Sequence, residues 1–121
     1  MSERLTLTQI ALLLGYAVAM AGGQLIFKLA ANRAPADGAL TDRLFGLVNA
    51  YFVLAVVLYA ALSVLWVWIL TFTPLSRAYP FVALAFAITP ALGILVFAEP
   101  LSTRLAIGIG LILCGLLFVA G

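Results

Sequence analysis

The sequence has no histidine, a single cysteine and only four acidic side chains against six basic ones. Because Cys114 stands alone, neither a disulfide within the chain nor a Cys/His metal site can form. The net charge of +2 is small and scattered, which is too weak to attract nucleic acid. We therefore expect no metal, no cofactor, no enzyme activity and no nucleic-acid partner, and we interpret Cys114 as a small packing residue.

Long apolar runs take up most of the chain instead. It is 67% hydrophobic, with a mean hydropathy of +1.31, whereas soluble domains are about half apolar. About 20 apolar residues are needed for a helix to cross a hydrocarbon core that is about 30 Å thick. The sequence thus predicts an all-α integral membrane protein with one domain over 1–121. Its four transmembrane helices are expected at about 5–31, 50–72, 75–98 and 101–120.

The amino-terminal run resembles a secretory signal peptide, because Arg4 precedes apolar residues 5–18 and the triplet Ala19-Met20-Ala21. We expect a retained membrane helix here. The charge of Arg4 is offset by Glu3, and the apolar run continues beyond the triplet through residues 25–27.

The connections and prolines subdivide the remaining chain. A polar stretch at 32–38 follows the first span, and Thr41 and Asp42 after it are typical of a helix start. A short interfacial helix is therefore predicted at about 41–49. Pro80 and Pro90 lie inside the third span, where each removes a backbone donor, so both are predicted to kink it.

Four crossings would place both termini and the turn at Pro74 on one side, side A. The long connection and the turn at Glu99 would lie on the other side, side B. Four basic residues then fall on side B and two on side A: Lys28, Arg33, Arg43 and Arg104 against Arg4 and Arg77. This excess favours side B as cytoplasmic by the positive-inside rule, but it is small, and inverted or dual insertion stays open.

The first span combines small residues with polar ones. Gly15, Ala19 and Gly23 recur every four residues, which predicts a seam for close helix packing. Beside this seam runs a stripe made of Tyr16, Met20, Gln24 and Lys28. A charge at the bilayer centre costs about 2.5–3.5 kcal/mol, which makes Lys28 a candidate site residue, and the polar amide of Gln24 in the same apolar run is a second candidate. The structural alternatives are a lysine that reaches the headgroups and an amide that only joins two helices.

Other candidate residues lie near the ends of the later spans. Arg77 is expected near side A, opposite Lys28, which would suit an anion received at one membrane face and released at the other. Its alternative is an interfacial anchor. Glu99 on side B is expected to pair with Lys28 or Arg104, or to cap a helix. Tyrosines such as Tyr79 offer polar-edged aromatic surface but are also typical of interfacial belts.

The fourth span has no polar side chain in its middle and is dense in small residues. Ala106, Gly110 and Cys114 recur every four residues, and Gly108 and Gly115 are two turns apart. This pattern is typical of a packing helix, either within the chain or against a second copy.

Four motifs in order resemble the drug/metabolite transporter superfamily. They are Gly-Gln-Leu-x-x-Lys at 23–28, Pro-Leu-Ser-x-Ala-Tyr-Pro at 74–80, Glu-Pro-Leu-Ser at 99–102 and Gly-x-x-Leu-Ile-x-x-Gly at 108–115. The chain resembles the four-helix small multidrug resistance fold and half of an EamA-type transporter. Most of all it resembles the small subunits proposed to flip undecaprenyl-phosphate-linked aminoarabinose across the bacterial inner membrane.

The resemblance implies a function and a partner. Small multidrug exporters depend on a glutamate in the first helix, and this chain has Met20 at that place. The resemblance therefore implies a multi-pass flippase, or flippase subunit, that moves a polyprenyl-phosphate-linked sugar across the bacterial inner (cytoplasmic) membrane. It also implies a homodimer, or a heterodimer with a similar small subunit. The residues that match the dimer motif are Gly108, Leu111, Ile112 and Gly115.

Within that reading the candidate residues receive hypothetical roles. Lys28 and Arg77 would hold the phosphate at opposite ends of a path, and Glu99 would tune Lys28 or bind an amino group. The sugar or groove residues would be Gln24, Tyr16 and Tyr79, and the kinks for gating would be Pro80 and Pro90. Two alternatives stay open: a proton-coupled exporter of the small multidrug resistance type that uses Glu99, and a non-transporting membrane partner of a glycosyltransferase.

Overall fold

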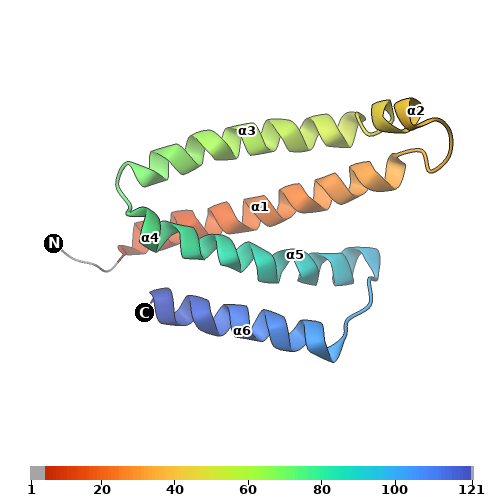
Figure 1. Cartoon of the computed structure of the whole chain (residues 1–121). Coiled ribbons are helices and arrows are strands. Elements are labelled where there is room, and N and C mark those ends of the chain that lie inside the picture. Colours follow the sequence, from red (N-terminus) through yellow and green to blue (C-terminus); the bar gives the residue numbers. More distant parts are fainter. Residues whose placement is uncertain (1–4, 121) are drawn as a thin grey trace.

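The computed structural model describes residues 5–120, with the side chain of Ala120 left out, and all its regular elements in this range are helices (Figure 1). The long helices are α1 (Leu7–Arg33), α3 (Ala50–Leu70), α5 (Val82–Phe97) and α6 (Thr103–Ala120). The short ones are α2 (Leu40–Phe45), α4 (Leu75–Ala78) and the 3-10 turn η1 (Tyr79–Phe81). The prediction of an all-α fold is confirmed.

Within residues 5–120, three segments are long and apolar enough to cross a membrane, namely α1, α3 and the continuous stretch Leu75–Phe97. The fourth, α6, is apolar but shorter at 18 residues. At about 1.5 Å per residue it extends about 27 Å, close to the thickness of the hydrocarbon core. The helices therefore match the predicted spans, and the chain is a multi-pass membrane protein.

Successive long helices run in opposite directions, so the described ends of the chain lie together with α4 at one end of the bundle (Figure 1). This end corresponds to side A. At the opposite end, side B, lie α2 and the turn between α5 and α6. Glu3 and Arg4, which entered the charge count, lie outside the described residues.

The four long helices are arranged in the order α3, α1, α5, α6, with α1 in contact with both α3 and α5 (Figure 1). The main core cluster lies toward side A and consists of Leu13, Ile69, Ala78 and Phe81. By contrast, α6 packs mainly on α5 and η1, so much of its surface has no neighbour among the described residues. This edge position is a feature that spacing within the sequence does not reveal.

The packing seam of α1 differs from the predicted one. Gly23 is buried, as expected, but Gly15 is exposed, and a Cβ atom there would meet no described atom within 4 Å. The buried small residues that accompany Gly23 are Ala17 and Ala21. The reason is that α1 has two long neighbours, so its small residues face in two directions: Gly23 meets α3, whereas Ala21 borders α5.

Two polar side chains join the ends of the helices. On side A, the Gln9 amide donates from Nε2 to the Phe72 carbonyl at 2.8 Å and to Thr73 Oγ1 at 3.2 Å. On side B, Asn49 Nδ2 donates to the Ala30 carbonyl at 3.0 Å. Asn49 Oδ1 also accepts from the Phe52 N–H and caps α3. The α1–α3 pair is therefore held at both membrane faces.

The interfacial helix and the proline-containing span were predicted only in part. Helix α2 is present, but it ends at Phe45 and not near residue 49, because Asn49 already caps α3. Pro80 lies in η1, where the helix tightens into 3-10 geometry, whereas α5 continues through Pro90. Gating at these prolines stays a prediction.

The turn after α5 holds one alanine in a strained backbone conformation, which a substitution can test. Ala98 has φ 53° and ψ 36°, a left-handed conformation that favours glycine. We expect Ala98→Gly to raise the free energy of unfolding by about 0.5–1 kcal/mol, after allowance for the larger entropy of an unfolded glycine. Unfolding of the purified protein by SDS would measure the change. Ala60→Gly in the middle of α3 is the control and should destabilise; stabilisation by both variants, or by neither, would contradict the prediction.

Candidate functional site

Two cavities between α1 and α5 share Gln24 and Thr89 in their linings, and we name these adjoining cavities together the α1–α5 groove. The side-B cavity, of about 160 Å³, contains Lys28 and Glu99. The cavity toward side A, of about 520 Å³, is bordered by Tyr79. Gln24 and Thr89 lie where the two cavities adjoin, so both side chains border each cavity.

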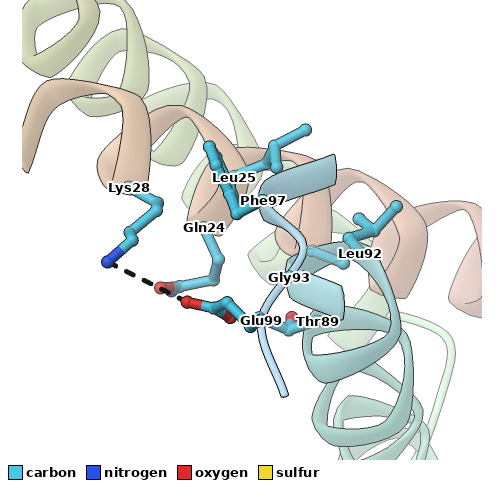
Figure 2. A pocket seen from close by; sticks show the side chains of 9 residues that line it. Gln24, Leu25, Lys28, Thr89, Leu92, Gly93, Phe97 and Glu99 are labelled. Atoms are coloured by element: carbon cyan, nitrogen blue, oxygen red, sulfur yellow. Dashed lines mark ion pairs between the residues drawn. The ribbon is translucent and has the colours of Figure 1, made fainter. Parts of the chain in front are cut away.

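An ion pair stands in the side-B cavity. Lys28 Nζ lies 3.9 Å from Glu99 Oε2, and both side chains are 47% exposed. Figure 2 shows these side chains and that of Gln24 directed into the same space. Pairs this exposed contribute at most about 1 kcal/mol, so a ligand can replace either partner at little cost. Of the two predicted partners of Glu99, the structure selects Lys28.

Gly93 makes room for the Glu99 carboxylate, a contact that the sequence did not suggest. A Cβ atom on Gly93 would overlap Glu99 Oε1. The backbone N–H groups of Ala98 and Glu99 both point to the Gly93 carbonyl, so the chain folds back over the last turn of α5. A bulkier residue at this position would push the carboxylate away from Lys28.

A tyrosine of α3 holds the Gln24 side chain in place by a hydrogen bond. Its Nε2 donates to the Tyr59 hydroxyl at 2.8 Å, and that hydroxyl donates to the Met20 carbonyl at 2.7 Å. The Tyr59 ring also stacks on Phe27, with centroids 5.3 Å apart and an interplanar angle of 11°. A tyrosine within an apolar span is typical of a belt or packing residue, and no spacing on α3 alone points from Tyr59 to Gln24.

The two candidate tyrosines differ in position. Tyr79 borders the groove and is 61% exposed. Tyr16 instead packs beside the core cluster, with its ring 4.9 Å from that of Trp66. Trp66 in turn lies 6.3 Å from Tyr79, so Tyr16 reaches the groove only through a row of three rings.

Arg77 lies outside the two cavities of the groove, at the carboxyl end of α6. Its Nη1 donates to the Val119 carbonyl at 2.9 Å. A cation at this end of a helix is favourable because the last carbonyls and the helix dipole are negative. The contact agrees with the anchoring alternative, and phosphate binding by Arg77 stays a prediction.

The candidate dimer residues lie on the lightly covered α6. Gly108 and Ile112 border a further cavity between α5 and α6, of about 400 Å³. Leu111 is 68% exposed, and Gly115 is exposed as well. A Cβ atom at Gly108 or Gly115 would meet no described atom within 4 Å. This face therefore has space for another helix.

These features define a small multi-pass membrane protein whose polar residues line a groove between two spanning helices. A protein of Enterobacter sp. (strain 638), named "Probable 4-amino-4-deoxy-L-arabinose-phosphoundecaprenol flippase subunit ArnE", is 30% identical over 100 residues. The match covers 83% of this chain and 85% of that protein. The chain belongs to the family of this flippase subunit. No family model and no solved structure matches it.

Proposed function

We propose that the protein is a flippase subunit that moves a polyprenyl-phosphate-linked sugar across the bacterial inner membrane. The observation that carries the proposal is the α1–α5 groove, which has a cation at its side-B end and neutral polar groups in its middle. The family relationship supports it, because the relative is named for the 4-amino-4-deoxy-L-arabinose lipid. The polyprenyl tail would stay in the bilayer while the headgroup follows the groove.

Lys28 would receive the phosphate. Its ammonium is half exposed within the side-B cavity, and the only charge beside it in the ion pair is that of Glu99. The phosphodiester of such a lipid carries one negative charge and two unesterified oxygens, so it can take the place of the Glu99 carboxylate beside Lys28. The released Glu99 would then be free to bind an amino group on the sugar.

The sugar would pass Gln24, Thr89 and Tyr79. Gln24 and Thr89 supply hydrogen bonds where the two cavities meet, and Tyr79 supplies an aromatic surface toward side A. Tyr16 would support Tyr79 through Trp66. The segment around Pro80 and Pro90 would change shape as the headgroup passes.

Arg77 would take over the phosphate at side A. For this it would exchange its hydrogen bond to the Val119 carbonyl for the phosphate oxygens. The exchange would couple arrival of the headgroup to the position of the end of α6.

The partner would be a second small subunit packed on α6, either identical or similar. Leu111, Ile112 and Gly115 are exposed, and a Cβ atom on Gly108 would meet no described atom within 4 Å, which supports this arrangement. The word "subunit" in the name of the relative supports a partner chain too.

Reconstitution tests the proposed function. Proteoliposomes containing the protein, alone and with any copurifying subunit, would be loaded with undecaprenyl-phosphate-linked 4-amino-4-deoxy-L-arabinose on one leaflet. Translocation faster than in protein-free liposomes is expected. No acceleration by either preparation, together with copurification of a glycosyltransferase, would favour the non-transporting alternative.

A second candidate function is a proton-coupled exporter, which the carboxylate of Glu99 in the groove favours. A substitution of Glu99 distinguishes it from the flippase. If Glu99 only shields Lys28, Glu99→Gln should tighten binding of undecaprenyl phosphate about 2- to 5-fold, the range expected for an exposed ion pair. Equilibrium binding in detergent would measure this. Resistance to cationic drugs on expression, lost in Glu99→Gln, would instead support the exporter; Asp42→Asn on α2 is the control for charge alone.

A further inference from the structure

We propose that Tyr59 fixes the orientation of the Gln24 amide so that the groove selects a sugar-bearing lipid over the bare polyprenyl phosphate. This inference rests on the proposed function and adds a positioning residue to it. Tyr59 does not line either cavity of the groove and acts through Gln24.

The hydrogen bonds of the Tyr59 hydroxyl determine which way the amide points. The hydroxyl has one proton, and it donates that proton to the Met20 carbonyl at 2.7 Å. The Met20 carbonyl can only accept, so this bond uses the single hydroxyl proton, and the hydroxyl cannot also donate to Gln24. The hydroxyl therefore accepts from Gln24, and only the amide nitrogen can donate to it. This leaves Gln24 Oε1, an acceptor, for the groove.

The Tyr59 ring is itself held in place. It stacks on Phe27 and lies against Gly23, where a Cβ atom would stand 2.7 Å from the ring. Because the ring has little freedom, the hydroxyl remains between α1 and α3. The orientation of the amide is thus fixed before any ligand arrives.

An acceptor at this point discriminates between headgroups. Gln24 Oε1 can accept from a hydroxyl or ammonium group of a sugar, and the Thr89 hydroxyl beside it can donate or accept. A fully ionised phosphate has no proton to donate and is repelled by the carbonyl dipole. The middle of the groove would therefore favour the sugar, and the phosphate would pass it without a favourable contact, whereas Lys28 would bind both the loaded and the bare lipid.

Tyr59→Phe tests this inference because it keeps the ring and removes only the hydroxyl. The amide can then rotate and present its nitrogen to the groove. We expect binding of undecaprenyl-phosphate-linked 4-amino-4-deoxy-L-arabinose to weaken about 3- to 10-fold and binding of undecaprenyl phosphate to change less than about 2-fold. Tyr51→Phe is the matched control: Tyr51 is also on α3, but it lies under the Arg33 guanidinium and away from the groove.

A double variant separates positioning from general destabilisation. In a Gln24→Ala background, Tyr59→Phe should have no further effect on the preference for the sugar-bearing lipid. A change in both lipids by the same factor, no change in either, or an effect that persists without Gln24 would overturn the inference. Each of these outcomes would leave the proposed function standing if the wild type binds the lipids.

Nuclear magnetic resonance reports on the orientation without any lipid. In protein labelled at glutamine nitrogen, the Gln24 side-chain amide should exchange its protons slowly in the wild type and quickly in Tyr59→Phe. If the wild type binds neither lipid, the proposed function fails, while this measurement still decides whether Tyr59 orients Gln24. Fast exchange in the wild type would overturn the positioning.

Discussion

Replacing Lys28 with alanine is expected to slow translocation of the sugar-bearing lipid about 10- to 100-fold, the range for losing a hydrogen bond to a charged group. The ammonium is the cation of the side-B cavity, and its removal would leave Glu99 to repel the phosphate. The rate in proteoliposomes, with the lipid delivered to one leaflet, measures the effect. Lys28→Arg keeps the charge and should retain most of the activity.

Two further variants sharpen this test. Arg33→Ala is the matched control, because Arg33 is a cation at the same end of α1 but lies over the Tyr51 ring. Its rate should stay within about 2-fold of the wild type, given the small contribution of exposed charges. Arg77→Ala tests the proposed release site on side A. Unchanged rates in both Lys28→Ala and Arg77→Ala would refute the proposed phosphate path.

Gly23→Val is expected to lower the free energy of unfolding by about 2–4 kcal/mol. Its Cβ atom would stand 2.7–2.9 Å from the end of the Tyr59 ring. The ring would have to move, which costs about 1–3 kcal/mol for overpacking and about 1 kcal/mol for each hydrogen bond lost to Gln24 or Met20.

The neighbouring glycine provides the control. A Cβ atom on Gly22 would meet no described atom within 4 Å, so Gly22→Val brings the same change in helix propensity without the overlap. Unfolding in SDS, followed by circular dichroism, would compare the two variants. Equal destabilisation would mean that α1 and α3 are not held together at Tyr59.

The polar stripe of the first helix was predicted in outline. Helical periodicity puts Gln24 and Lys28 on adjoining turns of one face, and the structure shows both in the α1–α5 groove. The same reasoning did not show which other helices contact α1 or at which positions they do so. Gly15 was expected to pack and is exposed, because α3 and α5 contact α1 at other positions.

Residues that act through contacts between helices could not be found from periodicity. Tyr59 is 35 positions away from Gln24 in the sequence. The role of Gly93 depends on a turn that brings the Glu99 carboxylate back over it. Thr89 was overlooked as well. A hydroxyl next to Pro90 in an apolar span was the one local signal that could have drawn attention to it.

That the chain is helical and crosses a membrane follows from the sequence alone, because hydrocarbon requires long apolar runs whose backbone groups are satisfied within each helix. The sequence also showed that Gln24 and Lys28 share one face of α1, since side-chain direction in a helix follows from spacing. The packing of the helices was needed to show that Lys28 pairs with Glu99, that Tyr59 holds Gln24 and that α6 lies at the edge. These features depend on which helices are neighbours and how they are rotated, and apolar surfaces that are nearly uniform around each helix carry little information about either.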